Sequence, residues 1–469
     1  MLFCEHLEKM MTEHGVKAVD IHRITGLKKP YISKMLSGSL IPPSYSTVET
    51  VMDAVGLTLE ERVVLTDAYQ KTRTTEEGIK LWRAFTTLYS LKIPAAAKRK
   101  TSGTKGIENA CILTGDALTD AVCALAGSAK GTLTLLYVPP VSSGSAADRI
   151  CSVFGSIPAD TEIKWLMPFG TDGNVGLEDF SDLTYCLPLM TLRPCAVTKY
   201  PTDLESFFGD SVFPFFILND SELIVFDRDI STGQYFRDEK LLALYRKKYT
   251  NGGKVLREPF MRSFEDPAQV ITFIEQGVAQ VASADYDYYI FANTPCIVFD
   301  LPKAVISDKV ADGFDSDMIA TMYVSLLRNI VTSANTFTDI FSLSGLIDYL
   351  DNDEFYELGK KFSKSMDREF RRNALKQYIG QAEDQQEFGA FGIKIPGFNI
   401  NAFIGANLLS TGLILLMYGF EEKTVIMTID EKSIADMLIK YIGELRKSGL
   451  IAGKEETISF VHNELSKRE

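Results

Sequence analysis

Basic side chains gather in one short stretch near the start of a chain whose formal net charge is -13. Residues 15–38 hold five Lys and Arg residues and a single Asp. Ammonium and guanidinium groups bind phosphate, while Tyr and Ser hydroxyls form hydrogen bonds with phosphates or base edges. These residue types predict contact with double-stranded DNA, and the candidate side chains are Lys17, Arg23, Lys28, Lys29, Tyr31, Ser33 and Lys34.

Two short helices must position these side chains. Gly26 gives the backbone the freedom that a tight turn between the helices requires. Pro30 falls in the first turn of the second helix, where a missing N–H costs little. The second helix then projects its polar face outward. Its core side, together with that of the first helix and a preceding helix, is expected to consist of Ile21, Ile24, Leu27, Ile32, Met35, Leu7 and Met11.

The spacing of these residues resembles that of a known family. Residues 5–70 are similar to the Cro and lambda-repressor-like helix-turn-helix family, often called XRE-type, in which two such helices read an operator. The resemblance implies DNA binding by a homodimer on paired half-sites. It covers about one seventh of the chain and rests on Gly15, the runs 21–27 and 31–34, Gly38, a Pro-rich turn and a fourth helix.

Three positions depart from the family pattern. His22, Ala18 and Lys28 stand where the family usually has alanine, glutamine and serine. An imidazole at position 22 implies a wider helix crossing or a partly exposed ring. The alternatives are that the lysines form an ordinary solvated face, or that the helices contact another protein. Concentrated positive charge in an acidic chain favours DNA, because the rest of the protein would repel a polyanion.

Charge and composition divide the chain into parts. Residues 1–106 hold 16 Lys and Arg against 11 Asp and Glu, a net charge of +5, and the remainder carries -18. The run AAAKRKTSGTKG at 95–106 is small, polar and without a hydrophobic period, as in a linker. We predict a helix-turn-helix domain at 1–72, a helix and linker at 73–106, and α/β lobes at 107–265 and 266–469.

After the linker the pattern becomes α/β. Apolar helices alternate with short apolar strands, which predicts a mixed sheet with helices packed on it. Residues 213–253 and 413–449 share an order of strand, polar turn, strand and helix. The large domain is therefore either two related lobes or one domain in which similar units arose by chance. The expected fold class is an α helix-turn-helix domain followed by this larger α/β domain.

Histidine is absent from residues 107–461, because the only four histidines are His6, His14, His22 and His462. Ser-His-Asp and Cys-His catalytic systems and histidine metal sites are therefore excluded from the large domain. Its repeated unit is similar in architecture to the C-terminal part of phospholipase D-like repeats, but both halves lack the HxKxxxxD motif. That resemblance implies a two-lobed sensor without catalysis. We expect no enzyme activity, no metal and no cofactor.

Three further motifs have alternative interpretations. The segment GTDGNVG at 170–176 is expected to be a flexible loop, with a loop over a ligand cleft as the alternative. The segment DGFDSD at 312–317 is expected to cap the helix that follows. Asp285 and Asp287 alternate with tyrosines and predict an exposed strand face or a polar pocket wall, with a general acid-base pair as the alternative.

One uncharged stretch is long enough to be considered as a membrane span. Residues 395–420 carry no charge but include a proline and three asparagines, whose amides are costly in lipid. We predict two buried strands joined by a turn at Asn407–Gly412. The charged start MLFCEHLEKM lacks a signal-peptide pattern and predicts a cytoplasmic protein. Seven cysteines without a CxxC pair predict reduced, mostly buried thiols.

Together these patterns predict a transcriptional regulator. Its N-terminal domain is expected to bind double-stranded DNA as a homodimer, and its acidic domain to mediate assembly and respond to a small-molecule effector. Two other functions remain open at this stage. One is an enzyme that acts on nucleotides or phosphoesters and is guided by the helix-turn-helix domain; the other is a protein-interaction scaffold.

Overall fold

The N-terminal part of the computed structural model is helical, as the periodicity predicts. Its elements are α1 (Phe3–Glu13), α2 (Ala18–Thr25), α3 (Lys29–Leu36), α4 (Tyr45–Val55), α5 (Leu59–Arg73) and α6 (Glu76–Tyr89). Over the whole chain, the described residues are 2–89, 91, 94–95, 103–139, 145–169, 177–201, 212–249, 259–264, 286–297, 299, 301–324, 328–352, 363–395, 404–409, 412–419 and 424–468.

Helices α1 to α5 enclose a small apolar core. The hydroxyl of Tyr45 shares a hydrogen bond with Thr66 at 2.8 Å, and the hydroxyl of Tyr69 donates to the carbonyl oxygen of Pro42 at 2.9 Å. Both tyrosines thus bury their rings and satisfy their polar atoms. The predicted core residues that the structure buries are Leu7, Met11, Ile21, Ile32 and Met35, and Leu27 packs against them.

The large domain is built on one mixed sheet of 14 strands. Its strands are β1 (Cys111–Thr114), β2 (Thr132–Leu136), β3 (Glu162–Phe169), β4 (Ala196–Pro201), β5 (Phe215–Leu218), β6 (Leu223–Phe226), β7 (Thr232–Phe236), β8 (Met261–Phe264), β9 (Asp287–Ala292), β10 (Thr336–Ser342), β11 (Phe388–Ile393), β12 (Ile404–Leu409), β13 (Leu413–Gly419) and β14 (Thr424–Asp430). The helices between them are α7 (Gly115–Gly127), α8 (Ser145–Ser156), α9 (Leu177–Leu192), α11 (Glu239–Tyr249), α13 (Lys303–Lys309), α14 (Ser316–Tyr323), α15 (Asn329–Ser333), α16 (Leu343–Asp351), α17 (Arg368–Asp384), α18 (Lys432–Lys447) and α19 (Lys454–Ser466).

The two halves of the sheet have the same strand order and directions. In the first, the order is β7-β6-β5-β2-β3-β4, and in the second it is β14-β13-β12-β9-β10-β11. In each half, three parallel strands are followed by an antiparallel meander that joins the edge of the first of them. Strand β8 pairs with β4 on one side and with β14 on the other, so it joins the halves. We call these halves lobe 1 (β1 to β7 with their helices) and lobe 2 (β9 to β14 with theirs).

The strand order corrects the alignment of the sequence repeat. Matching 213–253 with 413–449 pairs β5 and β6 with β13 and β14, whereas the topology pairs them with β12 and β13. The sequence interpretation missed β7, because TGQYF has too few apolar residues for a buried strand and shows the alternating burial of a half-exposed one. The helices α11 and α18, which follow the two meanders, are equivalent as predicted.

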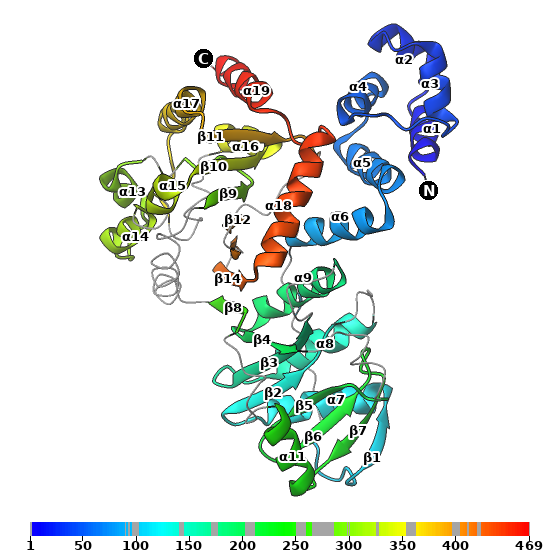
Figure 1. The fold of residues 1–469 in the computed structure, drawn as a ribbon, viewed down its shortest axis with the longest axis vertical. Helices are drawn as coiled ribbons and strands as arrows, with labels where there is room; N and C mark the ends of the chain where they lie inside the picture. Colours follow the sequence, from blue (N-terminus) through cyan, green and yellow to red (C-terminus); the bar gives the residue numbers. More distant parts are fainter. Residues whose placement is uncertain are drawn as a thin grey trace.

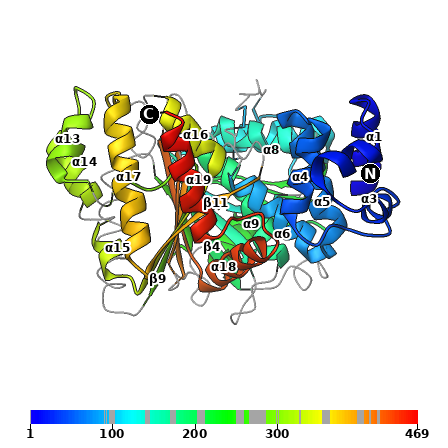
Figure 2. The ribbon, with the colours of Figure 1, turned by 90° about the horizontal axis from the view of Figure 1, so that it is seen from above.

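Helices cover both faces of the sheet (Figures 1 and 2). One continuous apolar cluster runs from the N-terminal helices through α6 to α7, α8, α9 and α18. A second cluster packs α13, α14, α16, α17 and α19 on lobe 2, and a third packs α11 on lobe 1. Figure 1 shows α6 between α5 and α18, with α9 below it. The helix α6 therefore connects the N-terminal domain to both lobes.

The described part of the uncharged stretch forms strands, as predicted, but β12 extends past the predicted start of the turn. Asn407 is inside β12 and faces Leu415 of β13 in the register, so the connection begins only after Leu409. Gly412 ends that connection with φ +111°, a backbone conformation that favours glycine. The described residues include no helix whose length and hydropathy suit a membrane span. None of the seven cysteines, which all lie among the described residues, forms a disulfide bond, and four of them are buried.

Candidate nucleic-acid interface

The turn between α2 and α3 is held by Gly26 and His22. Gly26 ends α2 in the left-handed region with φ +73°, and its N–H donates to the carbonyl oxygen of His22. The half-buried imidazole donates through Nδ1 to the carbonyl oxygen of Leu27 at 2.7 Å. The ring is partly exposed, one of the two arrangements expected at position 22. His22 stands where the similar family usually has alanine, and its hydrogen bond to Leu27 fixes the turn.

The seven candidate DNA contacts lie on α2 and α3 or directly before them. The structure buries Tyr31 by about half, between the exposed face of α3 and the core. The other six side chains are exposed, and they are Lys17, Arg23, Lys28, Lys29, Ser33 and Lys34. Figures 1 and 2 place α2 and α3 at the periphery of the molecule, away from the sheet.

Positive charge on α3 is not neutralised within the described part of the chain. Lys28, Lys29 and Lys34 have no ion-pair partner among the described residues. The single acid of the stretch, Asp20, accepts from Arg23 at 2.9 Å and from the backbone N–H of Lys17 at 3.1 Å. Asp20 thereby holds Arg23 on α2, while the three lysines stay available for an external anion.

One predicted core residue is misplaced. Ile24 is 61% exposed, not buried, and Val19 on the same helix is 51% exposed. The helix α2 is only eight residues long, and Ile21 alone is buried in it. A helix this short presents a single turn to the core, so the other apolar positions face outward. The exposure of Ile24 was not predicted, because the spacing of apolar residues does not give the direction of the helix axis relative to the core.

Contacts with lobe 2 fix the orientation of the N-terminal domain. The backbone N–H of Tyr45 donates to the carbonyl oxygen of Ser448 at 3.1 Å. The ammonium group of Lys394, at the end of β11, lies 3.7 Å from the carboxylate of Glu49 on α4 and also pairs with Glu456 on α19. Burial raises the pKa of Glu49 to about 7, although Lys394 acts in the opposite direction.

The other sequence candidates have structural roles or lie outside the described residues. GTDGNVG at 170–176 and Asp285 are outside them. Asp315 caps α14, as predicted, because its side chain accepts from the N–H of Met318 at 2.9 Å. Asp287 is half-buried on β9 and accepts from the hydroxyl of the exposed Thr336 at 2.6 Å.

A buried carboxyl group escaped the sequence interpretation. Asp339 on β10 has no exposed surface, and its Oδ2 accepts from the hydroxyl of Tyr378 at 2.6 Å and from the N–H of Cys296 at 2.8 Å. Its other oxygen has no hydrogen-bond partner among the described residues. Burial raises the pKa of Asp339 to about 7. The sequence signal that could have identified it is an acid between β-branched and aromatic residues in the strand TFTDIFS.

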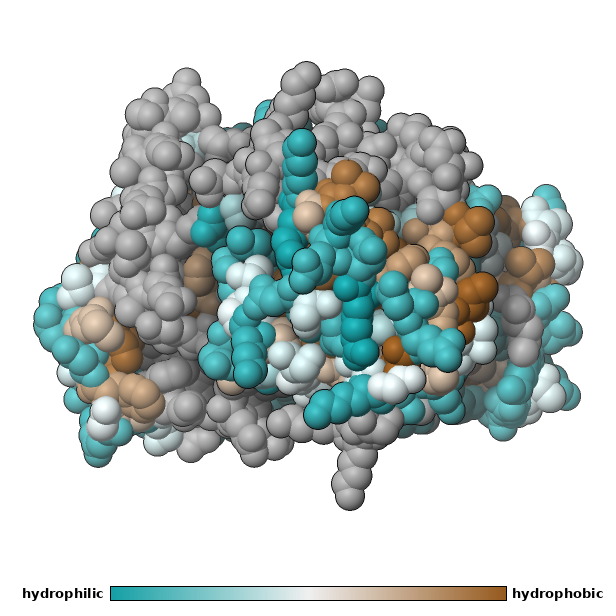
Figure 3. Space-filling model, turned by 90° about the horizontal axis from the view of Figure 1, so that it is seen from below, coloured by the Kyte–Doolittle hydropathy of each residue, from teal (hydrophilic) through white to brown (hydrophobic). Residues whose placement is uncertain are grey.

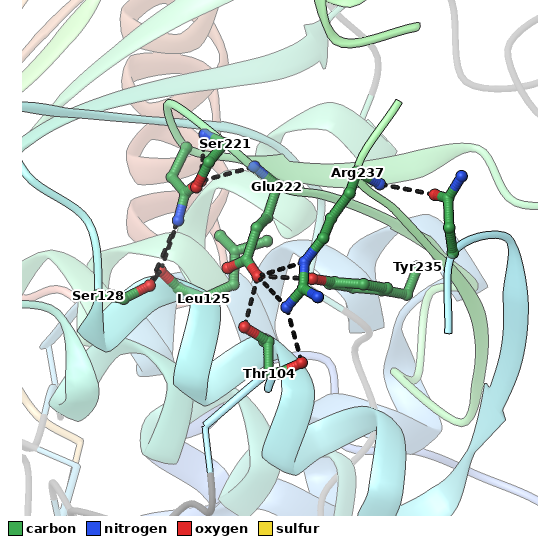
Figure 4. A network of polar contacts seen from close by, with 9 residues as sticks. Thr104, Leu125, Ser128, Ser221, Glu222, Tyr235 and Arg237 are labelled. Carbon is green, nitrogen blue, oxygen red and sulfur yellow. Dashed lines mark hydrogen bonds and ion pairs between the residues drawn. The ribbon is translucent and has the colours of Figure 1, made fainter. Parts of the chain in front are cut away.

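A second buried acid ties the end of the linker to lobe 1 (Figure 4). Glu222 accepts from the hydroxyl of Tyr235 at 2.5 Å, from Arg237 at 3.1 Å and from the hydroxyl of Thr104. Arg237 also donates to the carbonyl oxygen of Thr104 at 2.7 Å. Burial opposes the ionisation of Glu222, but these donors outweigh it and lower its pKa. The network is a structural anchor, because Thr104, Tyr235 and Arg237 all donate to the one carboxylate of Glu222.

Comparisons with known proteins give no family for this chain. No protein-family model and no curated protein matches it. Solved structures that it resembles include the phosphatidylserine synthase of Haemophilus influenzae Rd KW20, with 10% identity, a TM-score of 0.25, and coverage of 83% of this chain and 96% of that one. TrmBL2, described as an archaeal chromatin protein with a novel mode of DNA binding, has 12% identity and a TM-score of 0.19, over 47% of this chain and 80% of that one.

A third similar structure is a polyphosphate kinase from Porphyromonas gingivalis. It has 7% identity and a TM-score of 0.23, and the match covers 75% of this chain and 50% of the kinase. With TM-scores this low, none of the three likenesses establishes a shared function.

Proposed function

We propose that this protein is a DNA-binding transcriptional regulator that contacts duplex DNA through α3. The observation that carries the proposal is the free positive face of this helix. Lys28, Lys29 and Lys34 are exposed on one short element and lack ion-pair partners among the described residues. Phosphate contacts by such lysines provide affinity, and Ser33 and Tyr31 add hydrogen-bonding groups for base edges.

The proposal extends to assembly and control. A single module of this kind buries limited surface on DNA, so a homodimer that contacts two half-sites is the expected form. The large domain then mediates assembly and responds to a small-molecule effector, and we assign it no catalytic role. The domain contacts at Tyr45, Glu49 and Lys394 fix the direction in which α3 points. A change at these contacts would alter the spacing of two such helices.

Selection of bound sequences from random duplex DNA tests this function. The full-length protein is expected to enrich one sequence family, while Lys29→Ala/Lys34→Ala is expected to lose most of that enrichment. The double variant Lys240→Ala/Lys247→Ala is the matched control, because it removes two exposed lysines from α11 in lobe 1. It is expected to enrich the same sequences as the unmodified protein.

Two results would contradict the proposal. One is the absence of any enriched sequence with the unmodified protein. The other is unchanged enrichment by the Lys29→Ala/Lys34→Ala variant, which would show that α3 does not contact the DNA.

A further inference from the structure

A cavity opens on the face of the lobe 1 sheet that α11 covers only in part. We propose that it binds a small neutral ring compound that carries hydroxyl groups, of nucleoside or monosaccharide size. Its volume is about 350 Å³, within the usual range of small-molecule sites. Strands β2, β3 and β4 form its floor, and Tyr249 at the end of α11 and Pro259 stand at its rim.

The floor of the cavity follows from the register of the three strands. Thr134, Lys164 and Ala196 are aligned in one row across β2, β3 and β4, and Leu166 and Thr198 belong to the next row. Because successive side chains of a strand alternate between faces, all five lie on the same face of the sheet. The opposite face of these strands is covered by α7, α8 and α9. The floor of the cavity is therefore on the face of the sheet opposite these three helices.

Two threonine side chains line this floor, and neither hydroxyl group has a hydrogen-bond partner among the described residues. Thr134 is 4% exposed and Thr198 is 9% exposed. The structure gives neither hydroxyl a hydrogen bond to the described residues, although their neighbour Thr161 donates to the carbonyl oxygen of Ala129 at 3.4 Å. Neither hydroxyl oxygen belongs to the fully buried unpaired polar atoms, so both are accessible from the cavity and can form hydrogen bonds there. A ligand with its own hydroxyl or carbonyl groups would supply the missing partners.

The charges at the cavity favour a neutral ligand. Glu162 and Lys164 line the cavity two residues apart on β3, and their charged atoms lie 3.9 Å from each other. The two opposite charges offset one another for a ligand with a net charge. The remaining wall is apolar, through Leu166, Pro194 and the ring of Tyr249. An apolar wall with a few hydroxyl groups suits a ring compound that has both kinds of surface.

Binding at this site is reversible, because the thiol that lines it is a poor nucleophile. Cys195 is buried, and burial raises the pKa of its thiol to about 12. The thiolate is the reactive form of cysteine, so a thiol with a raised pKa stays protonated and inert near neutral pH. The ligand is thus held by hydrogen bonds and apolar contact, not by a covalent bond.

The cavity wall is also connected to the strand between the lobes. The N–H of Cys195 donates to the hydroxyl of Ser263 on β8 at 3.0 Å, and the N–H of Ser263 donates to the carbonyl oxygen of Cys195 at 3.0 Å. Strand β8 continues into lobe 2 through β14. A ligand against Cys195 would therefore contact the junction of the two lobes, and its role as the effector rests on the regulator function proposed above.

Ligand binding to the full-length protein, without DNA, tests the site. The probes are uridine, adenosine and D-glucose. Their binding is measured by isothermal titration calorimetry and by saturation-transfer NMR. Thr134→Val and Thr198→Val remove one hydroxyl each at nearly constant shape. Each is expected to weaken binding about two- to tenfold, the effect of one net hydrogen bond. Thr428→Val is the matched control, because Thr428 is a buried strand threonine of lobe 2 and lies outside the cavity.

The expected result is binding of at least one probe, weakened by both cavity variants and unchanged in Thr428→Val. Failure of all three probes to bind the unmodified protein would overturn the proposal, and so would equal affinity in all four proteins. Preferential binding of inorganic phosphate, which is anionic, would also overturn it. Because no DNA is present, these outcomes do not bear on whether α3 binds an operator.

Discussion

Asp339 is a buried acid whose ionisation links the stability of the fold to pH. Its carboxyl group is fully buried on β10, the strand next to the edge strand β11, with donors for one oxygen and no partner among the described residues for the other. Burial disfavours the charged form and raises its pKa to about 7, from an ordinary value of 3.8. The folded protein therefore binds a proton at a pH where the unfolded chain has already released it.

We predict that this proton makes stability fall as the pH rises. The contribution of Asp339 is fully present below pH 3.8 and is lost progressively up to about pH 7. The total is up to about 4 kcal/mol, since one pKa unit corresponds to about 1.4 kcal/mol. In Asp339→Asn the amide cannot ionise, so the unfolding temperature measured between pH 5 and pH 8 should fall less steeply than in the unmodified protein.

Asp308→Asn is the control for this measurement, because Asp308 is an exposed acid with 72% of its side chain accessible. Its pH profile should match that of the unmodified protein. Glu49, whose pKa burial also raises to about 7, is expected to leave a residual slope in Asp339→Asn. An identical slope in Asp339→Asn and the unmodified protein would contradict this assignment.

At the scale of elements, two glycines with positive φ differ in what surrounds them. Gly26, between α2 and α3, has φ +73° and open space where a Cβ would stand. Gly412, before β13, has φ +111°, and a Cβ there would lie 2.6 Å from Cα of Lys432. The first position requires only backbone freedom, whereas the second also requires the absence of a side chain.

We predict that Gly26→Ala is milder than Gly412→Ala. The first should cost about 1 kcal/mol, the conformational penalty alone, and should lower hydrogen-exchange protection only in α2 and α3. The second should cost more, because backbone must move, and should expose amides of β13 and α18. Equal losses, or a larger loss in Gly26→Ala, would contradict this view of the two turns.

Elements with strong periodicity could be predicted from the sequence, and those set by tertiary contacts could not. The helices of the N-terminal domain and the strands β2, β3, β5 and β6 follow from local pattern. Strand β7 was missed because it is half exposed, and the turn before Gly412 was placed too early because Asn407 reads as a turn residue but pairs inside a strand.

The candidate site was predictable to the same extent. Polar and charged residue types identify the outward face of α3, because exposure of lysine is the general rule. The exposure of Ile24 and the paired bond of His22 with Leu27 depend on helix direction and turn geometry, which residue types do not specify. The unpartnered hydroxyls of Thr134 and Thr198 are equally invisible in the sequence, because strand neighbours determine them.

At the scale of the whole molecule, α6 holds the domains together. The ring of Phe85 is fully buried and lies 5.1 Å from the ring of Phe291 on β9 and 5.5 Å from that of Tyr441 on α18. Helix α6 packs against α9 of lobe 1 as well. One aromatic side chain thus connects the N-terminal domain to a strand and a helix of lobe 2.

We predict that Phe85→Ala loosens the N-terminal domain without unfolding the lobes. Removal of a buried phenyl group typically costs about 3 to 5 kcal/mol. Hydrogen exchange should therefore increase in α6 and in the facing parts of β9 and α18, and small-angle scattering should show a larger radius of gyration. Thr86→Ala, at the neighbouring half-buried position of α6, is the control. Unchanged hydrogen exchange in Phe85→Ala would show that α6 does not connect the N-terminal domain to the lobes through this side chain.

The salt dependence of DNA affinity tests the central claim most directly. With the enriched duplex, fluorescence anisotropy at several salt concentrations gives the slope of log affinity against log salt, which scales with the number of phosphates contacted. The triple variant Lys28→Ala/Lys29→Ala/Lys34→Ala should bind more weakly, and its slope should be smaller by about 2 to 3 for each protomer bound. An unchanged slope and affinity would show that the lysines of α3 do not meet the phosphate backbone.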